Sequence, residues 1–114
     1  MDMRSVHTDG RVIASLLLTR LAEEVGKDTR IIVFVSAGVN VEEQHLRAMA
    51  PLLNYWHENN PRLEIYNFMA YLLKLKNENP QEFESLYLKT ESAHMSLKGN
   101  SLVAMALAKI IMAK

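Results

Sequence analysis

The stretch TRIIVFVS, residues 29–36, decides the fold, because it separates a bundle made only of helices from a fold that contains a sheet. Its centre, residues 31–35, consists of five successive apolar residues, four of them β-branched. β-Branched and aromatic residues favour strands, and a strand that is apolar at every position is typical of one buried on both faces. The same residues also fit a short buried helix that Asp28 caps and Gly38 ends. Both alternatives stay open at this point.

A strand at 29–36 requires a partner, because an unpaired strand leaves backbone donors and acceptors without hydrogen bonds. One candidate is the same strand in a second copy of the chain. The other is residues 63–68, LEIYNF, which would give a β-α-β unit at 29–68 through a helix at 41–58.

Outside this stretch, capping residues and apolar periodicity predict about five helices. The predicted starts are one of Thr8 and Asp9, then Asn40, Asn60, Asn79, and one of Asn100 and Ser101. In the first helix the apolar stripe is Val12, Ile13, Leu16, Leu17, Leu21 and Val25, whose spacing predicts one face of a helix. Later stripes run through 46–56, 65–73 and 83–97. The predicted fold class is mainly α, a single helical domain over 1–114 with one short buried apolar segment at 29–36; the alternative is a small α/β fold.

The composition bounds the class of protein. The chain has 114 residues, 49% of them hydrophobic, thirteen Lys and Arg against thirteen Asp and Glu, and no cysteine. A chain of this length and apolar content can bury one hydrophobic core without disulfides. Because it has no cysteine, we expect a cytoplasmic protein. The first ten residues lack the apolar segment of a secretory signal, and the longest apolar stretch, residues 102–112, is about half of a bilayer span, so no membrane association is expected.

No residue of the chain is assigned a catalytic or cofactor-binding role. None of the serines lies in a Gly-x-Ser-x-Gly motif, and the four glycines are too scattered to form a phosphate-binding loop. The sequence therefore favours a protein without enzymatic activity and without a cofactor.

Two Glu-x-x-His motifs, Glu42 with His45 and Glu91 with His94, raise the alternative of a di-metal carboxylate bundle. In an up-down bundle the second motif would lie roughly 13 to 18 Å along the helix axis from the level of the first, at 1.5 Å per residue. We therefore assign no metal ligand.

A nucleic-acid-associated regulator, or a small nucleoprotein subunit, is a further alternative. The first thirty residues are relatively basic through Arg4, Arg11, Arg20, Lys27 and Arg30. As a strand, however, residues 30–36 offer few polar side chains that could contact base edges. Nucleic acid is therefore not the favoured partner.

The favoured partner is protein. The last helix is apolar nearly all round, which is typical of a helix that is central to its bundle or docked on a partner. The predicted interface residues come from this helix and from the apolar segment: Ile31, Val33, Val35, Leu102, Met105, Ile110 and Met112. We expect a helical protein–protein interaction module, either a homo-oligomer or a small subunit of a larger assembly, presenting helical surfaces around 41–78 and 100–114.

Overall fold

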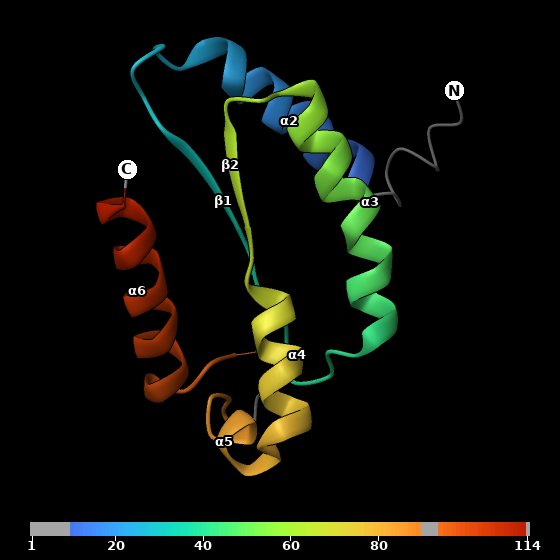
Figure 1. The fold of residues 1–114 in the computed structure, drawn as a ribbon, viewed down its shortest axis with the longest axis vertical. Helices are drawn as coiled ribbons and strands as arrows, with labels where there is room; N and C mark the ends of the chain where they lie inside the picture. The colour runs from blue at the N-terminus through green and yellow to red at the C-terminus, as the bar shows by residue number, and fades with distance from the viewer. Residues whose placement is uncertain (1–9, 90–93, 114) are drawn as a thin grey trace. The chain divides into compact units, whose positions relative to one another are not determined.

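The computed structural model describes residues 10–89 and 94–113. In chain order these residues form α2 (Gly10–Glu24), β1 (Ile31–Val35), α3 (Glu43–Asn59), β2 (Leu63–Asn67), α4 (Phe68–Glu78), α5 (Pro80–Glu84) and α6 (Leu97–Met112) (Figure 1). The described part is mostly helical, with five helices and one small sheet, which confirms the helix-rich fold class.

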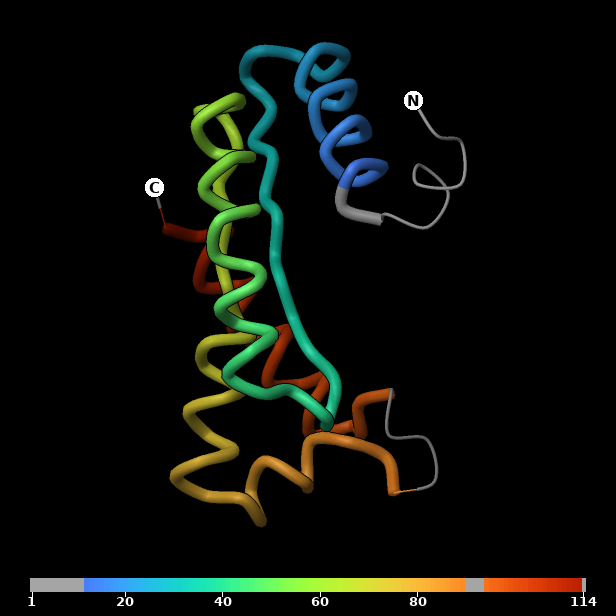
Figure 2. Tube along the Cα trace, turned by 90° about the vertical axis from the view of Figure 1, so that its right-hand side faces the viewer, coloured from blue at the N-terminus to red at the C-terminus, as the bar shows by residue number. Residues whose placement is uncertain are grey.

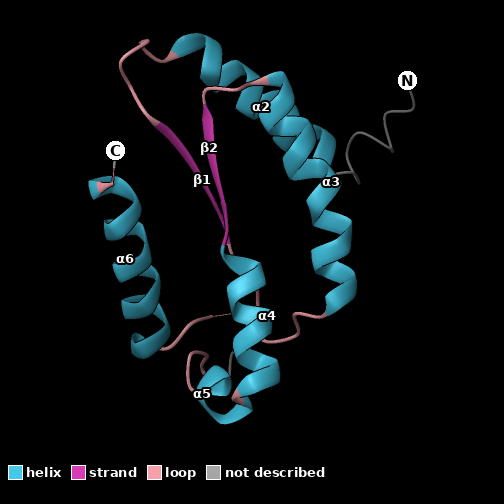
Figure 3. Cartoon of the chain, viewed as in Figure 1, coloured by secondary structure: helices cyan, strands magenta, loops and turns pink. Residues whose placement is uncertain are grey.

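The central part of the stretch at 29–36 forms a strand and not a short helix. β1 pairs with β2 in a two-stranded sheet, and the two strands run in the same direction (Figure 3). Parallel neighbours need a crossover connection, and α3 provides it, as the path of the chain in Figure 2 shows. The chain therefore contains the β-α-β unit that was predicted as the alternative for 29–68.

The helix predicted to start at Asn60 is wrong. Residues 61 and 62 form a turn, 63–67 form β2, and the helix starts only at Phe68. The apolar residues at 65–73 comprise the end of β2 and the first turns of α4. Their spacing matches the period of one continuous helix only by coincidence. Leu63, just before that stripe, is almost fully buried.

The helix predicted after Asn79 begins as expected but ends early. The Asn79 side chain accepts a hydrogen bond from the Glu82 backbone N–H at 3.2 Å, and Pro80 occupies the first helical position. α5 stops at Glu84, and Tyr87 and Met95 then form an isolated antiparallel bridge. This bridge reverses the chain where a continuous helix was expected.

The last helix starts earlier than predicted. Ser96, and not Asn100 or Ser101, is its N-cap, with the Ser96 side chain accepting from the Gly99 N–H at 3.2 Å. At α3, the expected cap at Asn40 is replaced by His45, whose Nδ1 accepts from the Glu42 N–H at 3.0 Å.

The described residues gather into two compact units. The first contains residues 10–33 and 47–66, and the second contains residues 34–46, 67–89 and 94–113. Each unit has its own buried apolar residues. In the first these are Ile31, Leu53, Trp56 and Leu63; in the second they are Val35, Val41, Met69, Leu72, Leu73, Phe83, Leu86 and Tyr87.

Arg62 organises the first unit. Its guanidinium donates to the carbonyls of Ala22 and Val25 at 3.2 Å, of Thr29 at 2.7 Å, and of Gly26. The last carbonyls of a helix have no partner within that helix, so a cation with several donors is well suited to this position. Arg62 thereby fixes the connection from α2 to β1 against the start of β2.

In the second unit, two side chains hold the loop between β1 and α3. Lys76 Nζ donates to the carbonyls of Val39 and Val41 at 3.3 and 2.8 Å, and the Tyr87 hydroxyl donates to the Ala37 carbonyl at 2.7 Å. Burial raises the pKa of Tyr87, which keeps this hydroxyl protonated as a donor.

Candidate interaction surfaces

The most apolar face of α2 points outward. Ala14, Leu18, Ala22 and Val25 are half-buried and lie on the face that packs within the first unit. The apolar residues on the other face are exposed, and Leu16 and Leu17 keep 61% and 65% of their surface accessible. The exposed set is Val12, Ile13, Leu16, Leu17 and Leu21. Of the apolar stripe predicted for this helix, only Val25 is half-buried, and the other members lie at the exposed surface.

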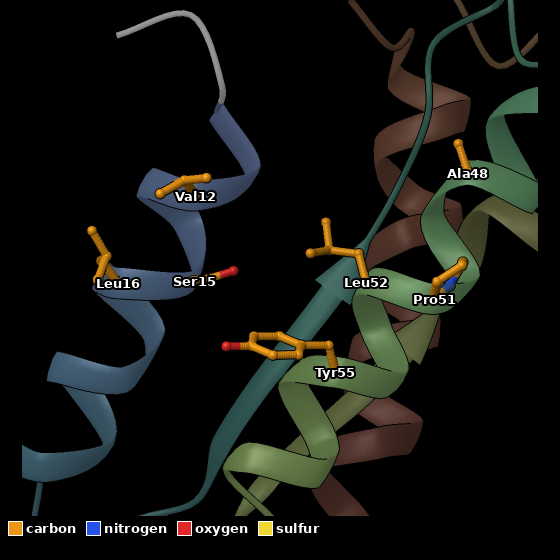
Figure 4. Close-up of a pocket in the computed structure, with 7 residues that line it drawn as sticks. All are labelled: Val12, Ser15, Leu16, Ala48, Pro51, Leu52 and Tyr55. Atoms are coloured by element: carbon orange, nitrogen blue, oxygen red, sulfur yellow. The ribbon is translucent and has the colours of Figure 1, made fainter. Parts of the chain in front are cut away.

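A groove lies between α2 and α3 in the same unit. It has a volume of about 590 Å³, and no charged side chain lines it. Figure 4 shows side chains of α2 on one side of the open space and side chains of α3 on the other. The lining residues are Val12, Ser15, Leu16, Ala48, Pro51, Leu52 and Tyr55.

Local sequence explains why the groove stays open. The side chains at Ser15 and Ala48 are too short to fill the space between the helices, and Pro51 lies inside α3 without a backbone N–H to give to the Arg47 carbonyl. The Trp56 indole N–H donates a hydrogen bond to the Ser15 hydroxyl at 2.6 Å and so links the two helices. The groove is thus apolar, with the hydroxyls of Tyr55 and Ser15 as its polar side-chain groups.

Within the second unit, the first turn of the terminal helix α6 packs closely against the segment around Leu86. A Cβ atom at Gly99 would lie 2.1 Å from the Leu86 carbonyl oxygen, so only glycine permits this approach. Ser96 donates from its hydroxyl to the Ser85 carbonyl at 2.7 Å, and Lys98 pairs with Glu82 at 2.7 Å. Gly99 is the buried residue of this helix.

Further along, α6 carries large exposed apolar side chains, including Met105 and Ile111, and Met112 is 82% exposed. A small cavity of about 250 Å³ lies between this helix and the segment 71–86, lined by Tyr71, Leu75, Glu82, Leu86, Lys98, Ser101, Leu102 and Met105. The second unit therefore also presents apolar surface.

The predicted interface residues fall into two groups. In β1, Ile31 and Val35 are buried and Val33 is half-buried. In α6, Leu102 and Ile110 are half-buried, whereas Met105 and Met112 are exposed. The exposed apolar residues of α2, including Leu17, were not predicted as interface residues, whereas the exposed Tyr55 lies within the surface predicted around 41–78. Periodicity could not have identified Leu17, because a stripe facing solvent has the same spacing as one facing a core.

Of the two Glu-x-x-His motifs behind the di-metal alternative, the structure describes only the first in full. Glu42 and His45 are joined by the capping hydrogen bond at the start of α3, which occupies His45 Nδ1. Glu91 lies outside the described residues. Within 10–89 and 94–113, no group of three or more His, Asp or Glu side chains is placed to hold a metal ion.

Two of the basic residues considered for nucleic acid are already paired with carboxylates. Arg20 Nε lies 2.7 Å from Glu24 Oε1. Arg30 makes a two-point contact with Glu64, at 2.7 Å from Nε and 2.5 Å from Nη2. The hydrogen bond from Arg30 lowers the pKa of Glu64 and raises that of Arg30. Arg4 lies outside the described residues, as does the side chain of Arg11.

None of the helices in the described ranges combines the length and apolarity needed to cross a bilayer. No protein family, no curated protein and no solved structure matches this chain.

Proposed function

We propose that this chain is a non-enzymatic protein–protein interaction module that forms homo-oligomers or serves as a small subunit of a larger assembly. The observation that carries the proposal is the outward face of α2, where five large apolar side chains are exposed. A contiguous exposed apolar face of this kind is typical of a surface that another protein covers.

The free energy gained by burying these side chains can be compared with the cost of association. Fully burying one leucine-sized side chain contributes about 1.5–3 kcal/mol, and a side chain that is already half-covered contributes about half of that. Association costs about 4–15 kcal/mol in lost translational and rotational freedom. Five such side chains from each of two copies contribute about 7.5–15 kcal/mol, which is comparable to that cost.

The exposed residues of α6 support the same function from the second unit. Methionine side chains, here Met105 and Met112, adapt well to irregular partner surfaces. The lack of cysteine supports a cytoplasmic location as part of this proposal.

The nucleic-acid alternative has less support, because the guanidinium groups of Arg20 and Arg30 are engaged by Glu24 and Glu64. The di-metal alternative gains no support from the first motif, because His45 Nδ1 accepts the Glu42 backbone N–H and the Glu42 carboxylate accepts from the Gln44 side-chain amide at 3.1 Å. We therefore put forward no second function.

The test is the solution mass of the purified protein by light scattering, at low and high salt and up to about 100 μM, where a contact of micromolar Kd is saturated. A dimer or larger oligomer that is insensitive to salt supports self-assembly. A monomer throughout this range contradicts it. A particle with a high 260/280 nm absorbance ratio that salt dissociates favours the nucleic-acid alternative instead.

A further inference from the structure

We propose that His45 is a pH-sensitive cap of α3: the neutral imidazole closes the first turn of this helix, and protonation of the imidazole opens it. The inference does not depend on the proposed function, because it concerns hydrogen bonds at residues 42–46, which all lie in the second unit.

The start of α3 has the geometry of a capping box. The helix begins at Glu43, so Glu42 is its N-cap residue and His45 is its third residue. His45 Nδ1 accepts a hydrogen bond from the Glu42 backbone N–H at 3.0 Å, and the Glu42 carbonyl accepts from the His45 backbone N–H, also at 3.0 Å. In a capping box the third helical residue is usually Glu or Gln, whose side-chain oxygen accepts this N–H. Here an imidazole nitrogen takes the place of that oxygen.

The hydrogen bond to His45 requires an uncharged ring. A backbone N–H can only donate, so Nδ1 presents its lone pair, and the single ring proton of neutral His45 is on Nε2. In the imidazolium both ring nitrogens carry protons, and Nδ1 can no longer accept. A positive charge in the first turn is also unfavourable, because the N-terminus of a helix carries a partial positive charge. Protonation therefore removes the cap.

The surroundings of His45 on its own helix allow this protonation. Its side chain is exposed, so protons from the solvent reach the ring directly, and histidine changes charge between about pH 5 and 8. Glu42 and Glu43 place two carboxylates in the same turn, and an imidazolium that leaves the capping position can pair with either of them. Arg47, the nearest cation of α3, is two positions further on, and residues at that spacing do not face each other on a helix.

The charged groups of α4 bring both signs to the start of α3. A cavity of about 320 Å³ lies between the two helices, and Glu43 of α3 lines it together with Lys74 and Glu78 of α4. Lys76, the remaining charged residue of α4, donates to two carbonyls of the loop before α3. Because Lys74 and Glu78 have opposite charges, α4 neither attracts nor repels a positive charge on His45 strongly. The pH response is therefore expected from the ring of His45 and the carboxylates of its own turn.

The second histidine of α3 is a natural control. His57 Nδ1 lies 3.3 Å from the Leu63 carbonyl oxygen, which can only accept, so in this hydrogen bond the ring nitrogen is the donor. Protonation of His57 leaves that donor in place. Of these two side chains on the same helix, only His45 loses its hydrogen bond when it is protonated.

The first test follows the ring nitrogens of His45 and the amide proton of Glu42 by NMR, on the full chain, between pH 8 and pH 5. We expect the Glu42 amide proton to move upfield as its bond is lost, with the same midpoint as the His45 ring. It should not titrate in this range in His45→Gln, whose side-chain oxygen accepts at every pH, or in His45→Ala, which has no acceptor. A wild-type Glu42 amide that stays unchanged while the His45 ring titrates overturns the proposal, whatever the variants do.

The second test measures the size of the effect by urea unfolding at pH 8 and at pH 5. We expect the unfolding equilibrium constant of the wild type, divided by that of His45→Gln, to rise roughly fivefold from pH 8 to pH 5, the size of a typical helix-capping interaction. For His57→Gln, the matched control, the same ratio should stay constant or fall, because the hydrogen bond from His57 survives protonation. A ratio for His45→Gln that does not change with pH, or that rises equally for His57→Gln, overturns the proposed cap.

Discussion

Trp56 donates its indole N–H to the hydroxyl of Ser15 across 2.6 Å, and this bond joins α3 to α2 at a distance of 41 residues in sequence. The Trp56 side chain is buried, so its donor has no ready access to water if the partner is removed. The bond therefore couples the stability of the first unit to the position of the helix that carries the exposed apolar face.

We expect Ser15→Ala to destabilise the protein by about 1–3 kcal/mol, because it leaves a buried indole N–H without this acceptor. Urea unfolding followed by tryptophan fluorescence measures the change. Ser101→Ala, at an exposed position of α6, is the matched control and should change the free energy of unfolding by less than about 0.5 kcal/mol. Equal effects at the two serines would show that the bond to Trp56 contributes nothing to stability.

Arg62→Lys should destabilise the end of α2. A lysine keeps the charge but lacks the planar set of donors that reaches the carbonyls of Ala22, Val25, Gly26 and Thr29. We expect a loss of about 2 kcal/mol, since hydrogen bonds from a charged donor contribute roughly 1.5–3 kcal/mol each and lysine retains some of them.

Hydrogen exchange provides the local readout for this variant, with faster exchange expected at the amides of residues 22–30. Arg47→Lys, at an exposed position of α3, is the control and should leave exchange in that segment unchanged. Protection that is equal in the two variants would contradict the role given to Arg62.

Gly99→Ala should weaken the attachment of α6. The added Cβ would lie 2.1 Å from the Leu86 carbonyl oxygen, a backbone atom that cannot move aside without shifting the chain. Overpacking of this kind costs about 1–3 kcal/mol, although alanine favours the helix by about 1 kcal/mol. Gly38→Ala, where a Cβ meets nothing within 4 Å, should be neutral or slightly stabilising in the same thermal unfolding experiment. A Gly99→Ala protein as stable as Gly38→Ala would show that α6 does not require this close approach.

The pair of Arg30 and Glu64 should give a defined pH dependence. The Glu64 pKa is lowered in the folded state, so its contribution is present above the unfolded pKa, near 4.3, and is lost as the pH falls through the lower folded value. The raised pKa of Arg30 has no effect in this window, because arginine is protonated throughout it.

We therefore expect Glu64→Gln to reduce stability at neutral pH and to match the wild type at the acidic end of the titration. The measurement is the difference in the free energy of unfolding between the two proteins as a function of pH. Because the pair is solvent-exposed, the difference will be small and should shrink as salt is added. A difference that stays constant across pH would rule out ionisation of Glu64 as its cause.

Local chemistry predicted much of the secondary structure. Residues 31–35 were recognised as a potential strand from their β-branched side chains, and Asn79 was identified as a helix cap, which its bond to the Glu82 N–H confirms. These features depend on neighbours in sequence. The pairing of β1 with β2 depends on two segments separated by α3, so the sequence could only offer it as one of two partners.

The candidate surface was harder to predict, for a physical reason. The spacing of Leu16, Leu17 and Leu21 shows that they share a face of a helix, but not what that face contacts. In the structure the small side chains of Ala14 and Ala22 lie on the inward face instead. In α6, the expectation of apolar surface at Met105 and Met112 agrees with their exposure, whereas Ile31 and Val35 lie within the chain's own core.

The parallel pairing of β1 and β2 also constrains how the chain folds. The two strands cannot join until residues 36–62 have been closed into a crossover, and α3, 17 residues long, shortens that loop when it forms. Refolding should therefore be limited by a non-local step that follows helix formation. Until that step is complete, the apolar residues 31–35 are available to other chains, so the refolding yield should fall as the protein concentration rises.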